Sequence, residues 1–265
     1  MKAQYTYVLN NKSVTIYKTK DGNYKEKTIF SNKFTNAMFD EIKDLVQSNQ
    51  VKTAWKKLKN HDNMFINYKG YKINVTSRKT TYLGNEINFS KTMIDELIGM
   101  ILETSKLSDV TAFQENNIDK FFKFMYKLER SDSFHILDEL YDFIKYNDIE
   151  IDESGDVICY KIVNSDYTDC FTSSIDNSVG QVVEMERSKI SDNRNESCSF
   201  GLHAASLSYL KRSRYGYSDD AHLMKIKIHP ADFVSVPYDY NGAKARVCKY
   251  EVIEEVDLSL ISNYN

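Results

Sequence analysis

Alternating apolar and polar residues predict two groups of strands in the first part of the chain. Residues 5–9 and 14–17 flank a polar turn at 10–12 and predict a β-hairpin, because asparagine tolerates the positive φ of tight turns. Residues 65–68 and 71–75 predict a second hairpin with Gly70 at its turn. The run before Asn88 predicts a further strand.

Apolar residues at helical spacing predict helices between and after these strands. Two are expected near residues 36–47 and 51–58, and two longer ones near 91–103 and 109–128. A fifth is expected to begin after Ser131 or Ser133. The other expected N-caps are Thr35 or Asn36 and Ser90.

The pattern changes after a turn at residues 152–155. Alternation at 224–228 and 247–252 predicts strands, and long polar loops separate them. We therefore expect an α+β protein in three parts. These are a basic N-terminal α+β region with helices at 1–104, a helical segment at 105–150, and a strand-rich C-terminal domain with long ordered loops at 151–265.

Composition agrees with a soluble globular protein, but charge is divided unevenly. Of the 265 residues, 42% are hydrophobic and 28% charged. Residues 1–100 carry 17 Lys and Arg against 9 Asp and Glu, whereas residues 101–265 carry 18 against 29. This asymmetry predicts different partners for the two parts, or docking of one on the other.

Neither a membrane span nor a secretory segment is expected. No apolar run approaches the roughly 20 residues that a spanning helix needs, and residues 1–7 contain no apolar signal core. We therefore expect the four cysteines to be reduced and any membrane contact to be peripheral.

Four blocks of polar residues between Gly155 and Val252 carry a resemblance. The first is Gly155-Asp156 with Tyr160-Lys161, and the second is Ser165-Asp166-Tyr167 with Asp176-Asn177-Ser178 and Gly180. The third joins Arg194, Cys198-Ser199, Gly201-Leu202-His203 and Tyr209. The fourth runs from Pro230-Ala231-Asp232 through Val234-Ser235-Val236-Pro237, Asp239-Tyr240 and Ala243-Lys244 to Arg246, Cys248 and Tyr250-Glu251-Val252. Together, these blocks resemble the phage rIIB family.

The resemblance implies a context rather than a reaction. It implies a phage accessory protein that acts early in infection on lysis timing and on escape from host exclusion or defence. Its implied partner is a rIIA-like phage protein or a host defence protein. The implied location is the host cytoplasm, with peripheral contact to the inner membrane as an option. No catalytic residue and no cofactor follow from it.

A second resemblance gives an alternative function. Residues 201–203, Ser206 and Tyr209 look like the strand-then-helix element of ADP-ribosyltransferase folds, with Tyr160 on the first strand of the pocket. That arrangement implies a pocket for a small nucleotide, such as an immune signal. The competing interpretation is that His203 is a structural histidine bonded to a loop carbonyl.

We expect eight residues to converge on one pocket or partner face: Tyr160, Asp176, Asn177, Arg194, Gly201, His203, Ser206 and Tyr209. Arg194 could hold a phosphate or carboxylate through two hydrogen bonds. For Asp176 and Asn177, the competing interpretation is turn formation, because both residue types bond their own backbone.

Metal and nucleic-acid sites are weaker hypotheses. Cys198 and His203 are five residues apart and lack the paired spacing of zinc sites, so no metal is expected. Basic residues beside Trp55 can track a nucleic-acid backbone, but they also suit a solvated helix face, so weak binding at most is expected. These residues are Lys52, Lys56, Lys57 and Lys59.

Overall fold

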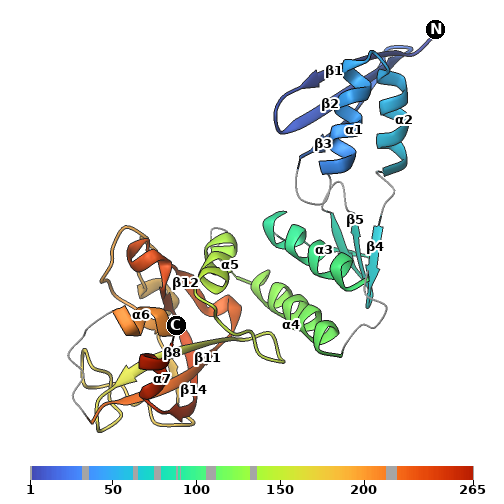
Figure 1. The fold of residues 1–265 in the computed structure, drawn as a ribbon. Coiled ribbons are helices and arrows are strands. Elements are labelled where there is room, and N and C mark those ends of the chain that lie inside the picture. Colours follow the sequence, from blue (N-terminus) through green and yellow to red (C-terminus); the bar gives the residue numbers. More distant parts are fainter. Residues whose placement is uncertain are drawn as a thin grey trace. The chain divides into compact units, whose positions relative to one another are not determined.

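The computed structural model describes residues 2–31, 36–61, 65–74, 79–87, 89, 91–105, 112–131, 136–212 and 220–264. It divides into two compact units, Met1–Leu102 and Glu103–Asn265 (Figure 1). Both contain helices and antiparallel sheets, so the expected α+β class is confirmed. Several expected positions lie outside the described residues: Thr35, Val75, Asn88, Ser90, Asp109 and Ser133.

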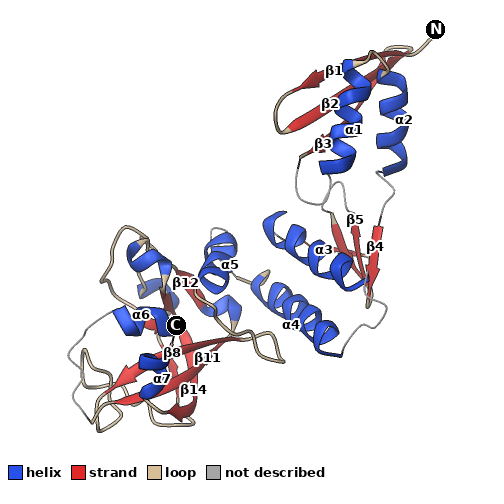
Figure 2. Ribbon diagram, in the orientation of Figure 1, coloured by secondary structure: helices blue, strands red, loops and turns tan. Residues whose placement is uncertain are grey.

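The first unit begins with a three-stranded antiparallel sheet. Its strands are β1 (Gln4–Leu9), β2 (Ser13–Lys20) and β3 (Asn23–Phe30). The expected turn is present, because the Asn10 side chain accepts hydrogen bonds from the amides of Lys12 and Ser13 at 2.8 Å. Helices α1 (Asn36–Gln47) and α2 (Val51–His61) cover one face of this sheet (Figure 2).

The core of this part joins sheet and helices. Buried residues of β2 and β3 pack against residues of α1 and α2 at helical spacing: Val14, Ile16, Ile29, Phe39, Ile42, Val46, Val51, Ala54, Trp55 and Leu58. Burying such side chains contributes about 1.5–3 kcal/mol each, so this apolar spacing positions both helices.

A four-stranded antiparallel meander and most of one helix complete the first unit. The strands are β4 (Phe65–Tyr68), β5 (Tyr71–Asn74), β6 (Thr80–Tyr82) and β7 (Asn85–Ile87), followed by α3 (Lys91–Ser105). Gly70 has a φ of 88°, which favours glycine at the turn between β4 and β5.

The second unit places helices α4 (Ala112–Leu128) and α5 (Ile136–Tyr146) before a seven-stranded sheet. The strand order is β12-β13-β10-β8-β11-β14-β9. The bounds are β8 Val157–Val163, β9 Val182–Glu184, β10 Leu202–Ala205, β11 His222–Ile228, β12 Phe233–Ser235, β13 Lys244–Val247 and β14 Lys249–Val256. Short helices lie between or after strands: η1 Arg187–Lys189, α6 Leu207–Arg212, η2 Pro230–Asp232, η3 Asp239–Gly242 and α7 Ser259–Asn263.

The sheet must curl strongly, because Cys248 alone joins β13 to β14. Three strands separate β13 from β14 in the sheet order. In a flat sheet that distance would be about 19 Å, whereas two residues span at most about 7 Å. The strand expected at 247–252 is therefore interrupted at Cys248, whose amide bonds the Asp232 carbonyl at 2.8 Å.

Helices α4 and α5 pack against the rest of this unit. The ring centroids of Phe143 on α5 and Phe233 on β12 are 6.1 Å apart. Lys127 of α4 forms a 2.6 Å ion pair with Asp156. Among the described residues, no helix combines the length and apolar character needed to cross a bilayer.

Candidate functional site

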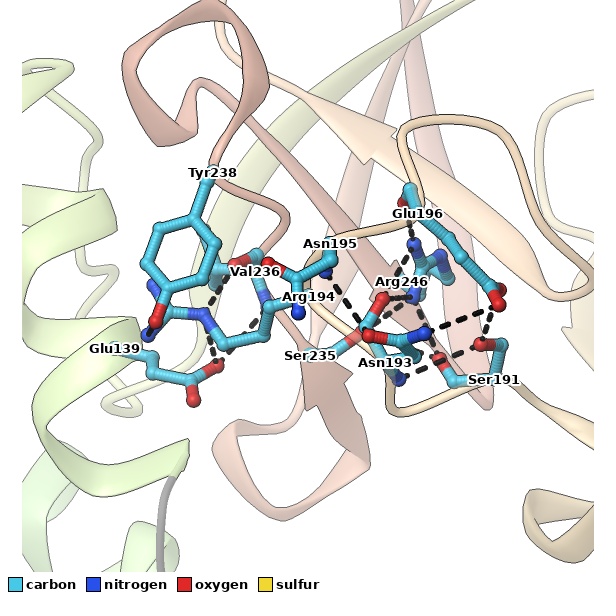
Figure 3. A network of polar contacts seen from close by, with 10 residues as sticks. All are labelled: Glu139, Ser191, Asn193, Arg194, Asn195, Glu196, Ser235, Val236, Tyr238 and Arg246. Carbon is cyan, nitrogen blue, oxygen red and sulfur yellow. Dashed lines mark hydrogen bonds and ion pairs between the residues drawn. The ribbon is translucent and has the colours of Figure 1, made fainter.

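The loop at residues 191–200 is fastened to the sheet by a fully buried arginine. The Arg246 guanidinium on β13 donates hydrogen bonds to the carbonyls of Ser191 (2.8 Å), Asn193 (3.2 Å) and Glu196, and to the Ser235 hydroxyl at 2.9 Å (Figure 3). Burying an unpaired guanidinium would cost several kcal/mol. The loop carbonyls offset that cost, so the loop backbone is ordered by its contact with Arg246.

A second arginine ties the same loop to α5. Arg194 donates from Nε to the Val236 carbonyl at 2.8 Å and forms a 3.3 Å ion pair with Glu139, which is buried on α5. Its guanidinium also lies 3.9 Å from the Tyr238 ring centroid (Figure 3). The expected anion-holding arginine is therefore engaged by protein groups, and it links the loop, α5 and the segment after β12.

Exposed aromatic and polar groups remain on the outer side of this ordered loop. Phe200 is 59% exposed and Tyr238 is 62% exposed. Hydrogen bonds from Ser199, Ser191 and Asn193 lower the pKa of Glu196, so its carboxylate stays charged. We call this surface the 191–200 face and define it by five exposed residues: Asp192, Asn195, Glu196, Phe200 and Tyr238.

Gly201 ends the loop at a position that has no room for a side chain. Its φ is +146°, and a Cβ there would lie 2.7 Å from Cγ2 of Ile190. Both the conformation and the close contact require glycine. The expected role of Gly201 in the site is thus a backbone role, because it lets the loop enter β10.

His203 lies on strand β10, directly opposite Arg246 on β13. Its Nε2 is buried and has no hydrogen-bond partner among the described residues. Burial lowers the pKa of His203 to about 4, and three nearby cations act in the same direction: Lys244, Lys161 and Arg246. The imidazole is therefore neutral at pH 7. It is a strand residue beside the Arg246 network, and within the described structure its Nε2 does not make the loop-carbonyl bond of the competing interpretation.

Ser206 and Tyr209 hold helix α6 in place. The Ser206 hydroxyl accepts a hydrogen bond from the Tyr209 amide at 3.1 Å and donates to the Ala243 carbonyl at 3.1 Å. Tyr209 is buried in a cluster with Ile162, Leu210 and Leu223. These are the contacts of a helix cap and a core side chain.

Asp176 and Asn177 form a turn on another part of the sheet. The exposed Asp176 carboxylate accepts from the Ser178 amide at 2.9 Å and from its hydroxyl at 2.6 Å. Asn177 is fully buried, donates to the Ile175 carbonyl at 2.8 Å and accepts from the Tyr250 hydroxyl on β14. Both have the contacts of turn-forming residues.

Tyr160 and Ser206 line a cavity of about 200 Å³ beside α6. A larger neighbouring cleft of about 460 Å³ shares Asn147 and Tyr264 with it and is also lined by Tyr146, Ser208, Arg212 and Asn241. Of the eight expected site residues, only Tyr160 and Ser206 line the smaller cavity, and none lines the larger cleft. Asn177 is bonded to β14 and Arg194 to the segment after β12. The structure thus distributes the expected site over several places.

Sequence reasoning left four residues of these networks outside the expected site. Glu139 and Tyr238 contact Arg194, and Lys244 and Arg246 lie on β13 with Arg246 buried beside the loop. The alternation Lys244-Ala245-Arg246-Val247 was the available signal, because it places two cations on one face of a strand.

Neither cysteine pairing nor a metal cluster occurs in the part of the chain that the structure describes. All four cysteines are free, with Cys159 buried and Cys170 and Cys198 exposed. No group of three or more His, Cys, Asp or Glu side chains gathers there with the geometry of a metal site.

The lysines of α2 lie opposite its buried face. Ala54, Trp55 and Leu58 are buried, whereas Lys52, Lys56 and Lys59 are exposed. Lys57 forms an ion pair with Glu41 of α1. This is the arrangement of a solvated amphipathic helix, and nucleic-acid binding through it stays a prediction.

Comparison with known proteins identifies one family and one relative. The family model described as "Bacteriophage T4 protein rIIB" matches residues 102–258. Protein rIIB of Enterobacteria phage T4 is 43% identical over 140 residues, which are 53% of this chain and 44% of that relative. The match therefore spans less than half of the relative's length. No solved structure matches, so the ADP-ribosyltransferase-like alternative has no structural relative behind it.

Proposed function

Because the chain belongs to the phage T4 rIIB family, we propose that it is an accessory protein that binds a phage or host protein and thereby protects the infection. The finer role is in lysis timing or in escape from host exclusion, and the partner is a rIIA-like phage protein or a host defence protein. Binding, rather than catalysis, is the activity.

The 191–200 face is the observation that carries this proposal. The buried Arg246 fixes the loop backbone, and Arg194 contacts Tyr238, yet the rings of Phe200 and Tyr238 remain exposed. Binding pays less conformational entropy when the interface is ordered beforehand. Aromatic side chains supply a large share of binding energy at interfaces. An ordered loop with one exposed ring, beside a second exposed ring on the segment after β12, therefore suits a protein partner.

The polar side chains behind this face support binding over chemistry. Both terminal nitrogens of Arg246 donate to backbone carbonyls, and one of them also donates to the Ser235 hydroxyl. Arg194 meets the Val236 carbonyl and the Glu139 carboxylate through Nε and donates to the Tyr238 hydroxyl through a terminal nitrogen. A catalytic group needs a reacting atom within hydrogen-bond reach. These two arginines instead meet groups of the protein itself, which orders the loop.

Two exposed aromatic positions test the proposal. Phe200→Ala and Tyr238→Ala should weaken co-purification of the rIIA-like phage protein with the tagged full-length chain at least ten-fold, because each removes an anchor. Phe200→Ala should leave the melting temperature unchanged, since its ring is mostly exposed. Tyr24→Ala, at a 67% exposed aromatic of β3, is the matched control. Undiminished partner binding and normal lysis timing in both face variants would contradict the proposal.

A nucleotide-binding function is the second candidate, and the larger cleft of about 460 Å³ favours it. Tyr146, Tyr264 and Arg212 line this cleft, and they offer aromatic rings and a cation to a base and a phosphate. A thermal-shift screen with nucleotides and cyclic nucleotides tests it, because a ligand at 100 times its Kd stabilises by about 2.7 kcal/mol. An Arg212→Ala variant should lose any shift that the wild type shows.

A further inference from the structure

Residues 164–181, which connect β8 to β9, are fixed by a buried carboxylate. Asp169 is 5% exposed and accepts five hydrogen bonds. Its Oδ2 accepts from the amides of Phe171 (3.2 Å) and Thr172 (2.7 Å). Its Oδ1 accepts from the Thr172 hydroxyl (2.7 Å) and from the amides of Ser174 (3.3 Å) and Ile175 (3.0 Å). One side chain thus orders the turn at 169–175.

A second network anchors the base of the same segment. The Tyr167 ring stacks on His222 of β11, with centroids 4.3 Å apart and an interplanar angle of 9°. Its hydroxyl donates to Oε2 of Glu255 on β14 at 3.0 Å, and His222 Nδ1 lies 2.7 Å from the other Glu255 oxygen. The segment is therefore attached to two neighbouring strands of the sheet.

Despite this ordering, the segment presents a large apolar side chain to solvent. Phe171, whose amide is held by Asp169, is 97% exposed, and Val179 is 55% exposed. Fixing a backbone costs about 1–2 kcal/mol per residue, and burial of a phenylalanine would stabilise by about 1.5–3 kcal/mol. Here the turn is ordered without that gain. A fully exposed aromatic on a fixed turn has the character of a preformed interface anchor.

The charge around Phe171 indicates the chemistry of its partner. Residues 164–181 contain three aspartates and neither lysine nor arginine. Hydrogen bonds from Thr168 lower the pKa of Asp166, and those from Ser178 lower the pKa of Asp176, so both exposed carboxylates are charged at neutral pH. The nearby cation Lys161 is only partly exposed and interacts with Asp169. Anionic phosphates of nucleic acid or lipid are disfavoured here, whereas lysine and arginine are favoured.

We propose that residues 164–181 form a docking surface for a partner protein that has an apolar pocket bordered by lysine or arginine. Phe171 fills the pocket, and Asp166 and Asp176 face the basic border. This surface is made of residues other than those of the 191–200 face, so it is a second site of protein contact and does not depend on the first.

The test uses the full-length chain in infected cells, with the photoreactive p-benzoylphenylalanine in place of Phe171 or, as the matched control, of Phe200. Both positions carry exposed phenylalanine, so the two probes differ in the surface they report. The position-171 probe should cross-link a peptide in which lysine or arginine flanks apolar residues. Asp166→Lys combined with Asp176→Lys should reduce this product at least ten-fold and leave the position-200 product unchanged. With the purified partner, Phe171→Ala should raise Kd at least ten-fold.

Each outcome decides the proposal. The proposal would be overturned by a position-171 product with nucleic acid, lipid or an acidic peptide, or by the absence of any product. It would also be overturned if the charge reversals left the yield of the product unchanged. A product at 200 without one at 171 would leave the proposed function standing and remove the second surface. A product at 171 alone would support the second surface and remove the 191–200 face as a site of partner contact.

Discussion

Replacing Asp169 by asparagine tests whether one carboxylate orders the turn below Phe171. Each carboxylate oxygen accepts at least two hydrogen bonds, from groups between Phe171 and Ile175. An asparagine amide nitrogen is a donor, so in either orientation at least two donors of the protein lose their acceptor. We expect Asp169→Asn to lower the free energy of unfolding by about 2–3 kcal/mol at pH 7, because hydrogen bonds to charged groups contribute about 1.5–3 kcal/mol each and part of that loss is recovered from water.

The pKa of Asp169 gives an independent magnitude. Burial alone would raise it, but hydrogen bonds from Thr172, Ile175 and Ser174 hold it at about 2, against an ordinary value of 3.8. This difference corresponds to at most about 2.5 kcal/mol of stabilisation by the charged form. Because the folded-state pKa is lowered, the stabilisation is present at neutral pH and is lost as the pH falls below about 4 towards 2. At pH 3, the difference between wild type and variant should be about half of its value at pH 7.

The assay must report the second unit. The chain's one tryptophan, Trp55, lies on α2 in the first unit, so its fluorescence is unsuitable. Urea unfolding followed by circular dichroism, with hydrogen exchange at the Thr172 and Ile175 amides, reports the turn itself. Asp166→Asn is the control, because Asp166 uses one oxygen for both bonds to Thr168 and asparagine can retain both. A stability change below about 0.5 kcal/mol for Asp169→Asn, or one that is as large at pH 3 as at pH 7, would refute this account.

Three further predictions concern other parts of the chain. The wild type should lose up to about 3 kcal/mol of stability between pH 6.5 and 4, because the lowered folded-state pKa of His203 makes its protonation destabilising. His203→Gln should reduce this loss, as measured by urea unfolding at several pH values followed by circular dichroism. Gly201→Ala should cost about 1–3 kcal/mol in urea unfolding and more than Gly180→Ala, where a Cβ meets nothing within 4 Å; equal effects would contradict the role of the Ile190 contact. In a filter-binding assay, nucleic acid should bind weakly, and its affinity should fall steeply with salt. Tight binding at physiological salt would contradict this expectation and indicate a binding site formed by Lys52, Lys56, Lys57 and Lys59.

Local patterns in the sequence predicted the local structures well. The turn at Asn10 and the helix from Asn36 to Gln47 occur where side-chain chemistry and apolar spacing place them. The Asp176 carboxylate accepts a hydrogen bond from the Ser178 amide, which is the turn contact that the competing interpretation predicted. Such features depend on residues within one or two turns of each other, so the sequence contains the information directly.

Contacts between distant segments could not be predicted in the same way. Arg194 meets Glu139 from an earlier helix and Val236 from a later loop, and nothing in its neighbours specifies either partner. The break at Cys248 is a similar case. Residues 247–252 alternate like one strand, but Val247 pairs with β10, whereas Glu251 and Val252 pair with β11. Both contacts depend on how distant segments pack in the whole unit, which no local pattern specifies.

Buried charged residues of the second unit order its loops, and this changes where binding should be sought. Asp169 and Arg246 are buried, and each fixes a loop through several hydrogen bonds. The groups left exposed by those loops, Phe171 and Phe200, are apolar residues that belong to no helical or strand-like pattern. Folding gains little from holding an exposed ring in one place, because the backbone entropy is lost and the apolar area stays in water. Binding recovers that area, so the residues beside a buried loop-ordering charge are better candidates for contact than the charge itself.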